Sequence, residues 1–492
     1  MEKMPKNPQE VLKTYFGFEA FRPTQQAVID RLLSGAQGHS LVLMPTGGGK
    51  SLCYQIPALC FEGGTLVLSP LIALMQDQVD ALRRRDIPAT FINATVSREQ
   101  REKRLADFLD GKIKMLYVTP ERFRKKDFAA AIRTARIDLL AVDEAHCVSE
   151  WGHDFRPDYS RIAEFREIIG NPLTVALTAT ATHAVQEDII LKLGLSEAEM
   201  KVFHQGIERP NLRLEAADVI NEDEKMTHFL EVIDNYPGAG IIYFSLIKSL
   251  EYYSEKLRAK GKRHLIYHGR LEPEQRKRAQ RRFLEEDGHL VLATNAFGMG
   301  IDKPDIRYVV HAEVPGSVES YYQEIGRAGR DGQPSLCRLL FGQNDLATQM
   351  EFIKWANPQP HFYERLLTLI YGHEDVVQSM GMDYLREQLN FKNRHDFRLE
   401  TALNMLDRYG MIEGFPGERR FKVLSYDLPE MLGDDDLHDE KLKSDQMKLL
   451  ALVQYFRSES CRRVYISDYF GFPGEAPCGN CDVCEERKAN SE

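Results

Sequence analysis

The chain has 492 residues, of which 43% are hydrophobic, and it carries a formal net charge of −10 at pH 7. This length predicts about three domains with sizeable cores, and no apolar run is long enough for a membrane-spanning helix, so neither a small binding module nor a membrane protein is expected. No apolar segment follows Met1–Lys6, so we expect a cytoplasmic protein without an export signal, nucleoid-associated if it is bacterial.

The first pattern that carries chemistry is a Gly-rich turn between a predicted strand, Leu41–Met44, and a predicted helix. Such a turn directs backbone N–H groups and a helix N-terminus at phosphate. Lys50 would reach the β and γ phosphates and Ser51 the magnesium ion. The strict pattern begins with Gly, whereas this chain has Met44 there. A purely structural turn is the alternative. The turn consists of Pro45, Thr46, Gly47, Gly48, Gly49, Lys50 and Ser51.

Two adjacent carboxylates follow a later apolar run. Ile137–Val142 predicts a buried strand that delivers Asp143 and Glu144 to its carboxyl end, where ligands bind in open α/β sheets. Carboxylate oxygens suit Mg²⁺, and an attacking water needs a base, so the two acids could divide these tasks. A solvated turn is the alternative for the pair taken alone.

An aromatic and basic loop comes directly after the acids. Bases stack on aromatic faces and arginine planes with little regard to sequence, so this loop could bind single-stranded DNA. The alternative is that its rings belong to the core. The candidate DNA-binding residues are Trp151, His153, Phe155 and Arg156.

Predicted strands alternate with predicted helices twice along the chain, which indicates two parallel α/β sheets. Pro-containing residues 208–211 separate the two series as a linker. The first series is Leu41–Met44, Thr65–Leu68, Met115–Val118, Leu139–Val142 and Val175–Leu177, and the second is Gly240–Phe244, Leu265–Tyr267, Leu290–Leu292 and Tyr308–Val310.

Two arginines close the second series. Arg327 and Arg330 are three residues apart, so on a helix they share a face, and a guanidinium supplied across a cleft can stabilise charge on a transferred phosphoryl group. The alternative is a pair of arginines that only forms salt bridges with the neighbouring domain.

The segment between Trp355 and Lys443 predicts two amphipathic helices, Asp383–Leu389 and Arg398–Tyr409. A hairpin of Met411–Phe415 and Arg420–Leu424 follows, which is a winged-helix pattern. Such modules commonly bind duplex DNA, and a packing spacer is the alternative. The acidic run 434–440 is predicted to be a solvated linker.

Four cysteines near the C-terminus predict a metal site. Sixteen residues separate Cys461 from Cys478, and Cys481 and Cys484 follow at two-residue gaps, a spacing that suits four thiolates around tetrahedral Zn²⁺. Without an export signal we expect a reducing compartment, which favours zinc over disulfides. The other four cysteines, Cys53, Cys60, Cys147 and Cys337, are predicted core thiols.

In their order along the chain, these patterns resemble a RecQ-type superfamily 2 ATP-dependent DNA helicase. Additional segments carry the resemblance: Phe16–Phe18 with Phe21–Gln25, Ser69–Leu74, Leu177–Ala181, Ala296–Asp302 and Gln323–Arg330. The form would be a short one, because the winged-helix and HRDC domains that follow the zinc module in many relatives are expected to be absent. An insertion before the zinc cysteines departs from the family.

The resemblance implies roles for individual residues. Phe18, Arg22 and Gln25 would bind adenine, with Phe18 where many relatives have Tyr. The phosphate-binding turn is Thr46–Ser51, with Ser51 and Asp143 holding Mg²⁺, and residues 151–156 would couple DNA binding to hydrolysis. The residues implied in catalysis are Lys50, Asp143, Glu144, His146, Gln323, Arg327 and Arg330, with Arg330 as the arginine finger.

The expected fold is α/β, with two RecA-like parallel-sheet lobes and a mainly helical zinc module that contains a winged-helix-like insertion. The lobes would span residues 1–206 and 207–343, the zinc module 344–356 and 441–492, and the insertion 357–440. The expected function is ATP-dependent, 3′-to-5′ unwinding of tailed or forked DNA in repair or recombination. Alternatives are a DEAH-type RNA helicase and a translocase or annealing factor with little unwinding.

Overall fold

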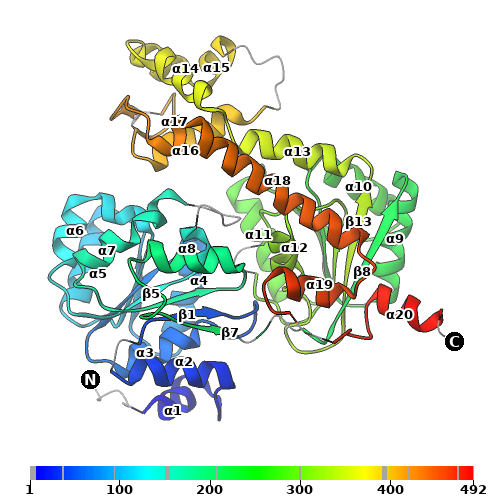
Figure 1. Ribbon diagram of the computed structural model, residues 1–492, viewed down its shortest axis with the longest axis horizontal. Helices are drawn as coiled ribbons and strands as arrows, with labels where there is room; N and C mark the ends of the chain where they lie inside the picture. Colours follow the sequence, from blue (N-terminus) through cyan, green and yellow to red (C-terminus); the bar gives the residue numbers. More distant parts are fainter. Residues whose placement is uncertain are drawn as a thin grey trace. The chain divides into compact units, whose positions relative to one another are not determined.

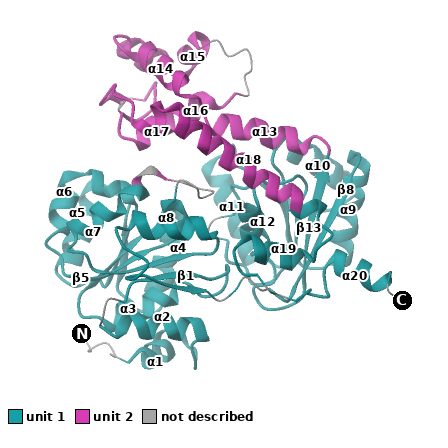
Figure 2. Cartoon of the chain, viewed as in Figure 1, with its two compact units in different colours: residues 1–155, 159–342, 455–492 teal, residues 156–158, 343–454 magenta. Residues whose placement is uncertain are grey.

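The computed structural model describes residues 7–35, 38–93, 95–149, 156–204, 206, 209–298, 301–389, 396–418, 421–473 and 476–490. It divides into two compact units (Figure 2). Unit 1 comprises residues 1–155, 159–342 and 455–492, and unit 2 comprises residues 156–158 and 343–454.

The first lobe of unit 1 is a seven-stranded parallel sheet with the order β3-β4-β2-β5-β6-β1-β7 (Figure 1). Its central strands are apolar on both faces, as expected for a parallel sheet covered by helices. The strands are β1 Ser40–Leu43, β2 Gly64–Leu68, β3 Ala89–Ile92, β4 Met115–Val118, β5 Ile137–Val142, β6 Leu173–Thr178 and β7 Lys201–His204.

Alternate residues of these strands enter two cores. Val42 packs with α2, α3 and α4, and Leu41 packs with α5 to α8 on the opposite face. The helices of this lobe are α1 Pro8–Val11, α2 Pro23–Leu33, α3 Leu52–Cys60, α4 Ile72–Arg83, α5 Arg98–Leu109, α6 Lys126–Ile132, α7 Ile162–Ile168 and α8 His183–Lys192. Shorter turns are the π turn η1 Leu12–Phe16 and the 3₁₀ turns η2 Pro120–Arg124, η3 Ala145–Val148 and η4 Pro157–Arg161.

The second lobe is a six-stranded parallel sheet with the order β10-β11-β9-β12-β13-β8. The two predicted parallel sheets are therefore confirmed, with four strands that the sequence pattern did not reveal: β3, β7, β8 and β13. The strands are β8 Leu212–Val219, β9 Ala239–Tyr243, β10 His264–Tyr267, β11 Leu290–Ala293, β12 Ile306–His311 and β13 Ser335–Gly342. The helices are α9 Glu222–Asn235, α10 Ile247–Ala259, α11 Pro273–Glu285 and α12 Val318–Ile325.

Unit 2 is mainly helical around a core of its own. Both predicted amphipathic helices are present, as is the predicted hairpin, whose strands β14 and β15 pair antiparallel. α15 has a kink at Gly381, where φ is 68° and ψ is −153°, and the hairpin turn at Gly417 packs against it. The elements are α13 Asp345–Ala356, α14 Pro360–Ile370, α15 Glu374–Gln388, α16 Arg398–Arg408, β14 Ile412–Glu413, β15 Lys422–Val423 and α17 Glu430–Gly433.

The acidic run 434–440 is not a linker, which corrects the prediction. It begins the 23-residue helix α18, Asp435–Arg457. The Asp434 carboxylate accepts a hydrogen bond from Leu437 N at 2.9 Å, and acidic side chains in the first turn interact favourably with the positive end of the helix dipole. The last helices, α19 Arg462–Tyr469 and α20 Asp482–Ala489, follow in unit 1. In the described part of the chain, no helix is both long and apolar enough to cross a membrane.

Candidate active site and metal centre

The Gly-rich turn lies between the end of β1 and the start of α3, as the sequence predicts. Gly47 and Gly49 both have φ of 80°, a left-handed conformation that favours glycine. Lys50 Nζ donates to Met44 O at 3.1 Å, within the turn. Burial lowers the pKa of Lys50, and the Glu144 and Asp143 carboxylates oppose this shift. Lys50 and both acids line the same cavity, where a phosphate would meet the ammonium.

Of the predicted adenine-binding residues, Arg22 and Gln25 lie beside this turn. Gln25 Nε2 is 3.2 Å from both Gly48 O and Gly49 O, and Gln25 Oε1 accepts from Arg22 N at 3.0 Å. A Cβ added to Gly49 would lie 2.5 Å from that Nε2, so a larger residue would displace Gln25 in addition to straining the backbone at φ 80°. Gln25 thus braces the phosphate-binding backbone, a contact that the sequence did not predict. Phe18 is 54% exposed, so its ring is available for stacking.

Asp143 and Glu144 lie at the carboxyl end of β5, as predicted. Glu144 N donates to Asp143 Oδ1 at 3.0 Å, and Glu144 adopts φ 48° and ψ 50°, a strained conformation for a residue with a side chain. Burial and then the Glu144 carboxylate raise the pKa of Asp143 to about 7. A cation beside such a carboxylate would favour its charged form, and Ser51 lines the same cavity, so the oxygen donors suit Mg²⁺.

His146 connects the acids to β6. Its Nδ1 lies 3.4 Å from Glu144 Oε2 and 3.0 Å from Thr178 Oγ1. Thr178 Oγ1 also contacts the backbone of Thr180, at 3.1 Å to its O and 3.2 Å to its N. All three side chains of this relay are largely buried, so a shift of Glu144 would be felt at β6.

The two arginines of the second lobe follow α12 and differ in their partners. Arg327 is buried and donates through Nη1 to Gly298 O within its own lobe. Arg330 Nη1 donates to Asp302 Oδ1 at 2.6 Å, and a Cβ added to Gly47 would lie 3.3 Å from Arg330 Cγ. Burial lowers the pKa of Arg330, with Asp302 opposing. Arg330 therefore lies over the Gly-rich turn, and Arg327 points to backbone.

These groups surround one cavity of about 530 Å³. Its size suits a nucleotide, and both acids and basic groups from both lobes face it. It brings together Lys50, Ser51, Asp143, Glu144, Gln323, Arg327 and Arg330, with Thr46, Gly47, Gly49 and Asp302 also in its lining. Of the residues assigned to hydrolysis by resemblance, His146 alone is absent from that lining, and it lies one contact behind Glu144.

Of the predicted DNA-binding residues, Trp151, His153 and Phe155 lie outside the described residues. Arg156 is partly buried and directly precedes η4. The coupling role predicted for this loop stays a prediction.

The four C-terminal cysteines meet as predicted. Their Sγ atoms all lie within 4.8 Å of one another, and those of Cys461 and Cys481 are 3.9 Å apart. A tetrahedral Zn²⁺ about 2.3 Å from each sulfur would set the sulfurs about 3.8 Å apart. Cys478 N donates to Cys461 Sγ at 3.2 Å and Asn480 N to Cys478 Sγ at 3.4 Å, which favours thiolates. The donor set fits zinc, and all eight cysteines are free of disulfides.

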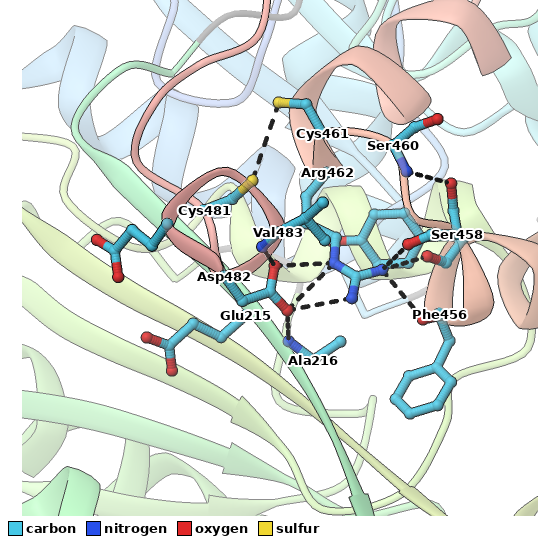
Figure 3. A network of polar contacts seen from close by, with 12 residues as sticks. Glu215, Ala216, Phe456, Ser458, Ser460, Cys461, Arg462, Cys481, Asp482 and Val483 are labelled. Carbon is cyan, nitrogen blue, oxygen red and sulfur yellow. Dashed lines mark hydrogen bonds and ion pairs between the residues drawn. The ribbon is translucent and has the colours of Figure 1, made fainter. Parts of the chain in front are cut away.

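A polar network joins this metal centre to β8 (Figure 3). Arg462 Nε donates to Asp482 Oδ1 at 3.0 Å, and Asp482 Oδ2 accepts from Ala216 N at 2.8 Å. Arg462 Nη1 also donates to Tyr455 O at 2.5 Å and Phe456 O at 3.0 Å. Since Arg462 and Asp482 each follow a cysteine ligand directly, metal binding and the docking of α19 and α20 depend on the same backbone.

Sequence reasoning missed several residues of the site. Thr178 and Asp302 lie within Leu177–Ala181 and Ala296–Asp302, two of the segments that carry the family resemblance. Membership of those segments was the signal that could have identified them. Arg209, in the linker, donates to backbone carbonyls, a contact that leaves no mark in the sequence of its partners.

Three family models match the chain. The DEAD/DEAH box helicase model covers residues 22–189, the helicase conserved C-terminal domain 224–332, and the RecQ zinc-binding model 426–485. The last of these contains all four cysteines, so the metal is zinc.

Curated relatives are similar over almost the whole chain. The chain is 37% identical to the ATP-dependent DNA helicase RecQ of Bacillus subtilis over 98% of its own length and 67% of the relative's. It is 35% identical to RecQ of Pasteurella multocida, covering 96% of itself and 62% of that protein. The probable ATP-dependent DNA helicase RecS of B. subtilis is 33% identical, with coverage of 97% and 91%. The chain thus spans about two thirds of the RecQ relatives.

Solved structures show the same fold at low identity. Dbp5 of Saccharomyces cerevisiae bound to RNA and ADP BeF3 has a TM-score of 0.54 and 19% identity, covering 70% of this chain and 90% of its own. The helicase MrfA bound to DNA has a TM-score of 0.55 and 18% identity, with coverage of 87% and 60%. Because one of these proteins is bound to RNA and the other to DNA, the fold alone does not determine which nucleic acid is bound.

Proposed function

The chain belongs to the RecQ family of ATP-dependent DNA helicases, and on that basis we propose that it moves 3′ to 5′ along single-stranded DNA and unwinds tailed or forked duplexes. We further propose that it does so in the cytoplasm, in DNA repair or recombination. The observation that carries the proposal is the cavity where Lys50, Glu144 and Arg330 converge. A site that is complete only with groups from both lobes couples hydrolysis to lobe movement, which translocation requires.

The residues of the cavity divide the work. Lys50 and the backbone of the Gly-rich turn bind the phosphates, and Glu144 orients the attacking water and accepts its proton. Mg²⁺, held by Ser51 and Asp143, would supply charge neutralisation on the phosphate oxygens. Arg330, with Arg327 and Gln323 beside it, stabilises the charge that develops on the γ-phosphoryl group.

The binding of DNA is communicated to this site through the residues that follow Glu144. The contact of His146 with Thr178 supports a relay in which residues 151–156 bind single-stranded DNA and shift Glu144 into its working position. Phe18, Arg22 and Gln25 bind adenine. Unit 2, with its helices and hairpin, includes the proposed winged-helix-like insertion at residues 357–440, which contacts the duplex ahead of the single strand.

Unwinding assays test the proposal directly. Matched duplexes with a 3′ tail, a 5′ tail or a fork are compared under single-turnover conditions, with Glu144→Gln as the hydrolysis-deficient control. We expect ATP-dependent unwinding of the 3′-tailed and forked substrates and none by the control. Activity restricted to the 5′-tailed duplex would overturn the direction. Stimulation of the ATPase by RNA in place of DNA would favour an RNA helicase, and hydrolysis without strand separation would favour a translocase.

A further inference from the structure

A side chain from the linker holds the turn that carries the two arginines. Arg209 lies three residues before β8, and its guanidinium faces the backbone that follows α12. Its Nη2 donates to Ala328 O at 2.7 Å and to Gly329 O at 2.8 Å, and its Nη1 lies 3.3 Å from Gly326 O. One guanidinium therefore contacts three carbonyls of the segment in which Arg327 and Arg330 stand.

The chemistry of this contact is specific to arginine. A guanidinium presents five N–H donors in one plane and can span several carbonyls, whereas an ammonium donates from a single point. Arg209 is partly buried, and that burial lowers its pKa. Carbonyls left without their donor in such a place would lose hydrogen bonds that water does not fully replace.

Asn211 supports the same turn. Its Nδ2 lies 2.8 Å from Gly329 O and 2.9 Å from Gln333 O. Gly329, four residues after the end of α12, adopts a φ of 53°, in the left-handed region that favours glycine. We call Arg209 and Asn211 the linker clasp. Arg463, two residues after the zinc ligand Cys461, lies 3.4 Å through Nη2 from both Arg209 O and Leu212 O, and so supports the backbone of the clasp.

The clasp also contacts the phosphate-binding turn. Arg209 Nη1 lies 3.4 Å from Thr46 O, and a Cβ added to Gly326 would lie 3.4 Å from Thr46 Cβ. Arg209 thus contacts the backbone before Gly47 and the backbone before Arg330, the two segments that must approach each other for hydrolysis.

We propose that Arg209 is a positioning residue for ATP hydrolysis: it fixes the turn Gly326–Arg330 so that the Arg330 guanidinium meets the γ-phosphoryl group of a nucleotide bound at Thr46–Ser51. This inference rests on the proposed role of Arg330. Arg209 touches no nucleotide atom itself in this assignment. Its loss should therefore lower kcat, since the transition state alone requires Arg330 in place, and leave the KM for ATP nearly unchanged.

The test compares three variants of the full chain. Arg209→Ala should lower the DNA-stimulated kcat by roughly 10- to 100-fold, the effect of misplacing a catalytic group by about 1 Å, with the KM for ATP changed by less than about threefold. Arg209→Lys should fall between Arg209→Ala and the wild type. Arg213→Ala is the matched control, because this nearby guanidinium pairs with Glu215 and Glu485 and not with the arginine turn, and its kcat should stay within about twofold.

Zinc content and the thermal unfolding midpoint are measured for every variant. A folded, zinc-loaded Arg209→Ala with wild-type kcat, or with a raised KM and unchanged kcat, would overturn the inference. If Arg209→Ala does not fold, Arg209→Lys is used for the test, and a wild-type kcat in Arg209→Lys would also overturn the inference. Arg330→Ala is assayed in parallel. Loss of hydrolysis in Arg330→Ala with full activity in Arg209→Ala refutes the clasp alone, whereas full activity in Arg330→Ala refutes the proposed role of Arg330.

Discussion

His146 Nδ1 lies 3.0 Å from Thr178 Oγ1, and this contact joins the acidic segment after β5 to the end of β6. The strands β5 and β6 are neighbours in the sheet. The end of β5 faces the proposed nucleotide site, whereas Thr178 at the end of β6 contacts the backbone of Thr180. The path from Glu144, the group proposed to activate water, to the end of β6 therefore consists of the Glu144–His146 contact and this hydrogen bond.

Replacing Thr178 with Val keeps the shape of the side chain and removes this hydrogen bond, together with the contacts of Thr178 Oγ1 with the Thr180 backbone. We expect DNA stimulation of the ATPase to fall about tenfold, because the bond is worth about 1.4 kcal/mol in coupling, while basal hydrolysis changes little. Thr65→Val in β2 is the matched control, since its buried Oγ1 has no hydrogen-bond partner among the described residues. Equal DNA stimulation in both variants would contradict the relay.

Arg330 and Arg327 should differ in function, the first acting in hydrolysis and the second in stability. Arg330→Ala should reduce kcat by about 10³-fold with little loss of stability, because its ion pair is with Asp302, which is 86% exposed. Arg327→Ala should lower the free energy of unfolding by about 2–3 kcal/mol, because it removes a buried donor from Gly298 O. ATPase kinetics and denaturant unfolding of both variants check this, and the reverse pattern would exchange their assignments.

Gln25 should matter for the phosphate-binding turn as well as for the base. Because Gln25 Nε2 donates toward Gly48 O and Gly49 O, Gln25→Ala should raise the KM for ATP by about tenfold and weaken inorganic pyrophosphate binding too. A competition assay with pyrophosphate measures the second effect. Gln26→Ala, whose side chain instead contacts Asp30, is the control. Unchanged pyrophosphate affinity would restrict Gln25 to adenine recognition.

Loss of a zinc ligand should destabilise the end of the chain. Cys484→Ser should release the metal and lower the unfolding midpoint by roughly 5 °C or more, because the metal contributes folding free energy at the network of Arg462 and Asp482. Cys60→Ser, a half-buried thiol outside the cluster, should keep both zinc and midpoint. Metal analysis and calorimetry decide, and full zinc in the Cys484 variant would disprove its role as a ligand.

The hairpin of unit 2 offers a test of duplex binding. Lys422 is exposed on β15, and Lys422→Glu should weaken binding to forked DNA by about tenfold at low salt and flatten its salt dependence, because a phosphate contact is lost. Basal ATPase should not change. Lys354→Glu on α13, 62% exposed in the same unit, is the control for net charge. Equal fork affinity in wild type and the Lys422 variant would favour a packing spacer.

The sequence predicted most of the sheet positions because buried parallel strands are continuous apolar runs. Leu41–Met44 was expected, and β1 spans Ser40–Leu43. β8 and β13 escaped prediction for a physical reason: β8 is half polar, and Arg338 interrupts the apolar run of β13 to pair with Glu215 and Glu231. A charge paired across strands cannot be distinguished in the sequence from a charge in a loop.

The site was predictable where chemistry demands a residue type, and not where it demands a backbone contact. The lysine of the Gly-rich turn, the paired carboxylates and the cysteines at fixed spacing can be recognised from the sequence alone. A nucleotide site and a metal centre were therefore expected. The contacts of Arg209 with Ala328 O and Gly329 O involve carbonyls, which every residue has. Their location depends on how the segments before β8 and after α12 pack in three dimensions.

β8 is the outermost strand of the second sheet, next to β13 alone. An outer strand presents unpaired N–H and C=O groups that can recruit a strand from another molecule and start aggregation. Asp482, fixed beside a zinc ligand, accepts the Ala216 N–H, and Arg213 on the same strand pairs with Glu485 of α20. The segment that carries the zinc ligands therefore covers part of the outer edge of this sheet. Without zinc this cover should be lost, so zinc starvation should first make the newly synthesised protein insoluble.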